Sequence, residues 1–192
     1  MILVAALAAG LLAGWLWARS RRQAYEAPQL RGLWLILLGF VPQLLVAFLP
    51  ASRAVIRSEL AAASLAISMV VFLAFIWINR RLAGMPLMLA GLLLNLAVML
   101  ANGGWMPISP ANATRLVGEA AMRQAVPGDR IGPKDVLMQP ADTRLGLLSD
   151  RFMLPAWSPY QVAFSAGDIF IAAGAFWLLA APRAAPLSEN TE

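Results

Sequence analysis

The chain has 192 residues, of which 60% are hydrophobic and 13% are charged, and its mean hydropathy is +0.70. Soluble globular domains carry about 25% charged residues, so this composition excludes an ordinary soluble domain and indicates that lipid surrounds most of the chain. The net charge is +5 and the pI is near 11.0. Because the arginines lie mainly between apolar segments, we expect them to orient membrane helices, and we expect no nucleic-acid partner.

The sequence contains no cysteine and no histidine. Disulfides, thiolate or imidazole metal ligands, histidine-ligated haem and histidine acid/base chemistry are therefore excluded. We expect no metal site and no cofactor, and any catalysis has to use carboxylates, hydroxyls, amides or arginine.

Five apolar runs of helical length follow one another along the chain. They are Met1–Trp17, Gly32–Leu49, Glu59–Asn79, Gly84–Asn102 and Ala163–Ala181, the last of which starts as early as Pro159. The first run has no basic residue before it and several after it, the reverse of a cleaved signal peptide, so we expect it to be retained. The pattern predicts an all-α integral membrane bundle of five transmembrane helices, forming a single domain over residues 1–192.

Basic residues and tryptophans indicate how this bundle is oriented. One side carries seven arginines, at positions 19, 21, 22, 31, 80, 81 and 183, and the short connection on the other side carries Arg53 and Arg57. Residues 103–158 also lie on that other side, but a segment of this length crosses largely regardless of its charge. The positive-inside rule then predicts an external N-terminus and a cytoplasmic C-terminus. The tryptophans agree with an interfacial belt: Trp15, Trp17, Trp34, Trp77 and Trp177 fall near the predicted inner ends, and Trp105 and Trp157 near the outer ends.

Residues 103–158 are the only extended polar region, and they lie between the fourth and fifth runs on the predicted outer side. Ser109 is a helix-capping residue followed by Pro110, which predicts a short helix that runs to about Gln124. We expect this partly helical external segment to lie over the outer mouth of the bundle or on the lipid headgroups.

Asp168 is a carboxylate inside the fifth apolar run. Counted from Pro159, it lies roughly 13 Å along the helix axis. An ionised aspartate at that depth costs at least ~2.5 kcal/mol, so the side chain should face protein or water and have partners, or be protonated. Asn102 is the preferred candidate donor, Asn95 the second, and Ser165 shares the face of Asp168. In one interpretation Asp168 is a polar link between the fourth and fifth helices, worth about 0.5–2 kcal/mol.

A second interpretation pairs Asp168 with Asp150, which precedes the fifth run by a short stretch. Two aspartates that share one proton provide an acid and a base able to activate water on an amide, as an aspartic peptidase requires. The hypothesis predicts that the two carboxylates approach one another directly or through one water, and a separation beyond ~10 Å would exclude it.

Two resemblances bear on this hypothesis. LGLLSDR and FSAGDIFIAAG resemble the two aspartate motifs of lipoprotein signal peptidase, a bacterial membrane aspartic peptidase, and the resemblance implies catalytic roles for Asp150 and Asp168. Leu147 and Ser165 stand where that family has asparagine, and five helices replace four. More of the chain, namely NGGWMP, LLSDRF and FSAGDIFIAAG, resembles a family of small bacterial polytopic membrane proteins known only as a domain of unknown function. That resemblance implies a bacterial plasma membrane but no activity.

Three functions stay open. The preferred one is a non-enzymatic interaction or accessory component, with the lipid bilayer and another membrane protein as partners. The second is a membrane aspartic peptidase that uses Asp150 and Asp168. The third is a small transporter or proton path through Asp168, Asn95 and Gln43, which the absence of a visible repeat disfavours.

Overall fold

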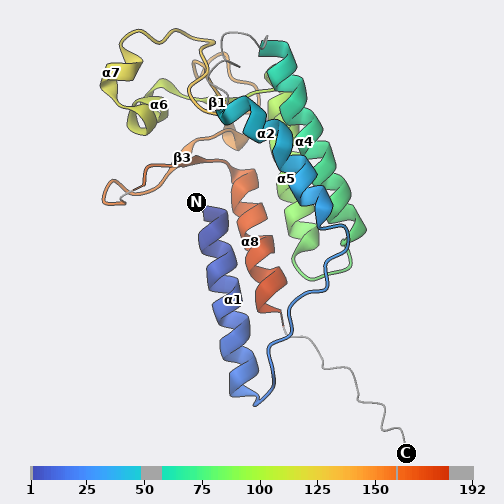
Figure 1. Cartoon of the computed structure of the whole chain (residues 1–192). Coiled ribbons are helices and arrows are strands. Elements are labelled where there is room, and N and C mark those ends of the chain that lie inside the picture. Colours follow the sequence, from blue (N-terminus) through green and yellow to red (C-terminus); the bar gives the residue numbers. More distant parts are fainter. Residues whose placement is uncertain (1, 49–57, 159, 182–192) are drawn as a thin grey trace, which may run out of the picture.

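The computed structural model describes residues 2–48, 58–158 and 160–181 (Figure 1). Within these ranges the fold is mostly helical, with seven α-helices and four short strands. The five longest helices are α1 (Ile2–Ser20), α2 (Trp34–Phe48), α4 (Ser58–Ile78), α5 (Met85–Ala101) and α8 (Ala166–Ala180). They follow the five predicted apolar runs. Outside the described residues lie Met1, Leu49, Arg53, Arg57, Pro159 and Arg183, on which parts of the sequence predictions rest.

The long helices pack in the order α1, α8, α5, α4 and α2. Figure 1 shows α1, α4 and α8 running in one direction and α2 and α5 in the opposite one, with residues 103–158 and 160–164 gathered at one end. The first and last elements of the chain are thus neighbours, and α8 lies between α1 and α5. This arrangement places the N-terminal end of α8 directly beside the polar segment.

Two of these helices are long and apolar enough to cross a membrane by length and composition, α1 and residues 59–78 of α4. The apolar parts of α2, α5 and α8 are shorter, between 10 and 17 residues. In α8 the cause is local, because Ala163 and Phe164 form a strand and the helix begins only after Ser165. The predicted helical start at or before Ala163 is therefore wrong.

Glycines allow α8 to approach both of its neighbours closely. A β-carbon added at Gly10 of α1 would lie 2.6 Å from the carbonyl oxygen of Phe176, and one added at Gly14 would collide with the carbonyl of Leu179. On the other side, Gly167 of α8 lies against Gly91 of α5. Because no side chain separates the backbones there, polar groups near these glycines meet directly.

The polar segment is built around a short parallel pair of strands. β1 (Met106–Ile108) pairs with β2 (Asp135–Leu137), and Met106 lies opposite Asp135. All six strand residues are buried. Trp105, Met106 and Val136 join Ala61, Ala62, Leu65, Val98 and Met99 in one core cluster, which fixes the segment to α4 and α5. Only 7% of Trp105 is exposed, because its ring packs inside this cluster.

The predicted helix after Ser109 forms, but it is interrupted. Ser109 accepts a hydrogen bond from the backbone of Asn112 and caps α6 (Pro110–Val117). Gly118 then adopts a positive φ of 87°, which ends α6, and α7 (Glu119–Met122) follows as a separate turn. A single helix to Gln124 is therefore wrong, because a glycine with left-handed φ stops regular helix geometry.

A hairpin connects the polar segment to α8. After the 3-10 turn η1 (Gly146–Leu148), β3 (Phe152–Met153) pairs in antiparallel fashion with β4 (Ala163–Phe164). The rings of Phe152 and Phe164 stack with their centres 5.7 Å apart. Since β4 leads directly into α8, the hairpin fixes where that helix starts.

Candidate functional site

Asp168 lies in the first turn of α8 and belongs to its N-terminal cap. The Ser165 side chain accepts a hydrogen bond of 3.0 Å from the Asp168 backbone, and the Asp168 carboxylate accepts one of 3.1 Å from the Ser165 backbone. This reciprocal capping box satisfies two backbone donors at the helix start. The predicted depth of roughly 13 Å along the helix axis is therefore wrong, because α8 begins only at Ala166. At a helix N-terminus the macrodipole favours the negative charge of Asp168.

Asn95 of α5 makes the link to Asp168 across the helix contact. Its Nδ2 donates to Asp168 Oδ1 at 2.8 Å, and its Oδ1 accepts from the Ser165 hydroxyl at 2.7 Å. Asn95 and Ser165 are buried, with 3% and 0% of their surface exposed. The side-chain polar atoms of Asn95 and Ser165 thus have partners, as buried polar groups require, and both side chains hydrogen-bond to the partly buried Asp168.

Asn102 does not reach Asp168, although it was the preferred candidate. Its Nδ2 donates to the carbonyl oxygens of Val98 and Arg144, and its Oδ1 accepts from the Arg144 backbone. Asn102 therefore ties the end of α5 to the loop before η1. Gln43, the third member of the predicted proton path, lies on α2, which packs against α4.

Asp150 is buried next to β1 of the polar segment. Its side chain is 1% exposed, and its backbone N–H donates to the carbonyl of Pro107 in β1. The Asn112 side chain donates to the carbonyl oxygens of Asp150 and Arg151, at 3.2 and 3.0 Å. Hydrogen bonds from the β1 backbone and from an α6 side chain to the backbone around Asp150 thus fix a buried carboxylate at this end of the helices.

Lys134, the only lysine in the chain, brings the two predicted aspartates together. Its Nζ lies 2.6 Å from Asp150 Oδ2 and 3.7 Å from Asp168 Oδ2. A third carboxylate follows it in sequence, with Asp135 Oδ1 at 3.9 Å from Nζ. We call these four residues the lysine–aspartate cluster. The separation of the nearest Asp150 and Asp168 oxygens cannot exceed the sum of the first two distances, which is within the ~10 Å limit set above.

The cluster joins four parts of the chain at one point. Lys134 and Asp135 are held by β-pairing, since the Lys134 carbonyl accepts from the Met106 backbone. Asp150 comes from the loop after η1, and Asp168 comes from α8, where it is bonded to α5 through Asn95. The polar segment is thereby attached to the helices by ion pairs as well as by its apolar core.

Burial and charge act strongly on two members of the cluster. Partial burial on its own lowers the pKa of Lys134, but the carboxylates, Asp150 foremost, outweigh it and raise that pKa above its usual value of 10.5. Burial raises the pKa of Asp135; Lys134 opposes this rise, whereas Asp150 and Asp168 add to it, and the result is a pKa of about 7. Lys134 is therefore a permanent cation, and Asp135 titrates near neutral pH.

Lys134 and Asp135 were not predicted as site residues from the sequence. The available signal was that the only lysine of an arginine-rich chain stands beside an aspartate in the polar segment. No local pattern connects that dipeptide to Asp150 or Asp168, because β1–β2 pairing brings them together. Among the described residues, no group of three or more acidic side chains has an arrangement that could hold a metal ion; here an ammonium lies among the carboxylates.

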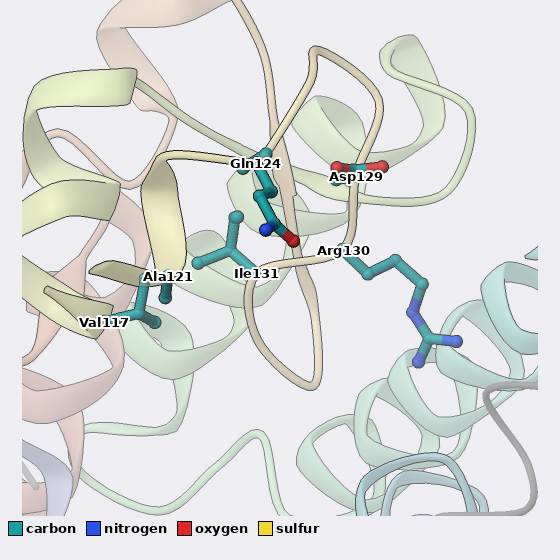
Figure 2. Close-up of a pocket in the computed structure, with 7 residues that line it drawn as sticks. Val117, Ala121, Gln124, Asp129, Arg130 and Ile131 are labelled. Carbon is teal, nitrogen blue, oxygen red and sulfur yellow. The ribbon is translucent and has the colours of Figure 1, made fainter. Parts of the chain in front are cut away.

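A separate hollow lies on the surface of the polar segment, with a volume of about 500 Å³. Its lining comes from α6, α7 and the loop that follows them: Val117, Ala121, Gln124, Ala125, Asp129, Arg130 and Ile131. Figure 2 shows the Arg130 side chain extending away from Val117, Ala121 and Ile131. Its guanidinium lies 4.6 Å from the centre of the Trp105 ring. No residue of the lysine–aspartate cluster lines this hollow.

Comparison with protein families places the chain. A family model matches residues 28–180, a range that contains the whole lysine–aspartate cluster and Asn95. The chain belongs to DUF5317, a family of unknown function. The matched range ends with the last residue of α8 and leaves α1 outside. Comparisons with curated proteins and with solved structures find no match. The resemblance of the two aspartate motifs to lipoprotein signal peptidase stays a prediction.

Proposed function

We propose that this DUF5317 protein is a non-enzymatic, multi-pass component of a bacterial plasma membrane. Its five long helices span the bilayer, and residues 103–158 form an external cap that contacts another membrane protein. The observation that carries this proposal is the Lys134 ammonium, which contacts both Asp150 and Asp168. An aspartic peptidase needs a shared proton and a water between its two carboxylates. Here a fixed cation takes that place and attaches the cap to the helices.

The outward faces of the long helices support a lipid environment. Large apolar side chains are exposed on all five, for example Leu12 at 56%, Leu37 at 72% and Leu60 at 63%. A soluble protein rarely leaves such extensive apolar surface uncovered. Trp15, Trp34 and Trp77 are also exposed, as interfacial anchors are. At the end of the helices opposite the cap, the two short connections carry Arg19, Arg21, Arg22, Arg31, Arg80 and Arg81. The positive-inside rule counts such short connections and not a long segment like the cap, so in this proposal the N-terminus lies outside and the C-terminus in the cytoplasm.

Cysteine labelling tests this orientation cleanly, because the chain has no cysteine of its own. Gln124→Cys places a thiol on the exposed surface of the cap, and Gln23→Cys places one in the exposed connection after α1. A membrane-impermeant maleimide should label Gln124→Cys in intact cells and Gln23→Cys only after permeabilisation. The reverse pattern would contradict the orientation, and equal labelling of both in intact cells would contradict the membrane crossing.

Photo-crosslinking tests the partner. A photoreactive residue at Ala121, exposed on α7, should form a discrete protein adduct in membranes, whereas one at Leu37, on the outward face of α2, should react with lipid. The detergent-solubilised wild-type protein should run as a complex under native conditions. A strictly solitary monomer, together with no adduct from the cap, would contradict an interaction role.

A second candidate function is a membrane aspartic peptidase, favoured by the observation that Asp150 and Asp168 contact one ammonium. Catalysis would require Lys134 to leave the pair, and its side chain is 35% exposed. In this case Asp150→Asn and Asp168→Asn, at unchanged membrane levels, should both accumulate the same uncleaved membrane protein. The matched control is Asp142→Asn, in an exposed turn of the cap. No accumulation in either variant would exclude the peptidase.

A further inference from the structure

Asp135 and Asp150 are the two most deeply buried carboxyl groups of the lysine–aspartate cluster. Their side chains are 8% and 1% exposed. Both are fixed by β1, because Asp135 lies opposite Met106 in the strand pair and the Asp150 backbone donates to Pro107. Both also lie near one ammonium, because Lys134 Nζ is 3.9 Å from Asp135 Oδ1 and 2.6 Å from Asp150 Oδ2. Two buried acids are thus held side by side by the backbone of a single strand.

Among the described residues, one oxygen of each carboxyl group accepts no hydrogen bond. Asp135 Oδ1 and Asp150 Oδ1 are both buried in this state, and Asp135 Oδ1 lies 3.9 Å from the Lys134 ammonium, whereas Asp150 Oδ2 accepts a hydrogen bond from it. Buried carboxylate oxygens are normally satisfied, and two such acceptors cannot satisfy each other without a hydrogen between them. A single proton supplies that hydrogen, because a protonated carboxyl group becomes a donor.

We propose that Asp135 and Asp150 form a proton-binding site, in which Asp135 carries the proton and donates it to the Asp150 carboxylate. The local charge favours binding of a proton, since three carboxylates surround one ammonium. A metal cation is a poorer occupant, because the Lys134 ammonium lies only 3.9 Å from Asp135 Oδ1 and would repel it. The proposal does not depend on what the cap binds.

The charged groups that act on Asp135 are Lys134, Asp150 and Asp168, and together with burial they set its pKa at about 7. The site is therefore filled below neutral pH and emptied above it. Loss of the proton adds a negative charge to a buried cluster that already has more carboxylates than cations. The strength with which the cap is held should consequently change over the pH range in which the site empties.

Infrared difference spectroscopy on the full chain in lipid nanodiscs tests the site directly. A protonated carboxyl group has a C=O stretch that is distinct from the bands of a carboxylate. Wild-type protein should show this band at about pH 5.5 and lose it on titration to about pH 8.5, with a midpoint near the folded pKa. Asp135→Asn should lack the band, and Asp142→Asn should retain it.

Three results would overturn the proposal. They are the absence of the band in wild-type protein near pH 5.5, its persistence in Asp135→Asn, and its loss at constant pH when choline is replaced by sodium. The last result would assign the site to a metal cation. Asp150→Asn is the second variant, which breaks the same pair from the other side should Asp135→Asn fail to fold. Its titration midpoint should fall well below that of wild type, and an unchanged midpoint would also overturn the proposal.

Discussion

Asn95 of α5 donates a 2.8 Å hydrogen bond to Asp168 of α8 while accepting one of 2.7 Å from Ser165. Replacing Asn95 by alanine removes both bonds and leaves a buried hydroxyl and a partly buried carboxylate without these partners. We expect a loss of about 1–3 kcal/mol in the free energy of unfolding. Thermal unfolding of the detergent-solubilised protein measures this, with Leu93→Ala on the exposed face of the same helix as control. Equal stability of the two variants would mean that the Asn95 contacts contribute nothing.

At Gly167 the backbone of α8 packs directly against α5, next to the hydrogen bonds that Asn95 makes. An added β-carbon there would collide with Asn95 Oδ1 and would lie 2.5 Å from the Gly91 carbonyl oxygen. Gly167→Ala should separate the helices and cost about 1–3 kcal/mol, as overpacking does. Ala173→Val, on the exposed side of α8, is the matched control. Unfolding temperatures of the two variants give the comparison, and a Gly167→Ala protein as stable as Ala173→Val would rule out the close approach.

The stability of the fold should depend on pH through Asp135. Its pKa is raised from 3.8 to about 7 in the folded protein, so between these values the folded state binds more protons than the unfolded state. The contribution is fully present below pH 3.8 and is lost as pH rises through about 7. The free energy of unfolding should fall by up to about 1.4 kcal/mol per pH unit within that window, and Asp135 should add no further slope above it.

Asp135→Asn supplies the control for this pH dependence. The amide imitates the protonated acid and cannot ionise, so the variant should have a flatter profile and should be more stable than wild type at about pH 8. Asp129→Asn, in an exposed turn of the cap, should keep the wild-type slope. Chemical unfolding in buffers across the window provides the measurement. A wild-type slope in Asp135→Asn would show that another group carries the effect.

The sequence was sufficient to predict the helices but not where α8 begins. The five apolar runs correspond to five helices, because apolar runs of this length are longer than typical strands and favour a helix. The boundary between β4 and α8 could not be seen in the apolar run from Ala163, since Ala163 and Phe164 are apolar but belong to a strand. The sequence did contain a signal for the true start, because Ser165 and Asp168 have the spacing of a capping box.

The partner of Asp168 could not be chosen from spacing alone. Asn95 and Asn102 lie seven residues apart on one face of α5, so either satisfies the same periodicity. The contact between Gly91 and Gly167 sets the level of α8 along α5 and thereby places Asn95, one turn beyond Gly91, beside Asp168. Lys134 and Asp135 are harder still to predict, since they reach the site through strand pairing between distant segments.

The Lys134–Asp150 contact of 2.6 Å is central to the site, because Lys134 also reaches Asp168 and so attaches the cap to the helices and occupies the aspartate pair. Lys134→Met leaves a buried carboxylate without its cation, and breaking a buried ion pair in this way costs about 3–5 kcal/mol. In an Asp150→Asn background the same substitution should cost much less, because no charge remains at residue 150. A double-mutant cycle by chemical unfolding of the full chain in detergent is the most direct measurement. A coupling free energy of several kcal/mol is the predicted result, and a coupling below about 0.5 kcal/mol, as for an exposed ion pair, would contradict the account.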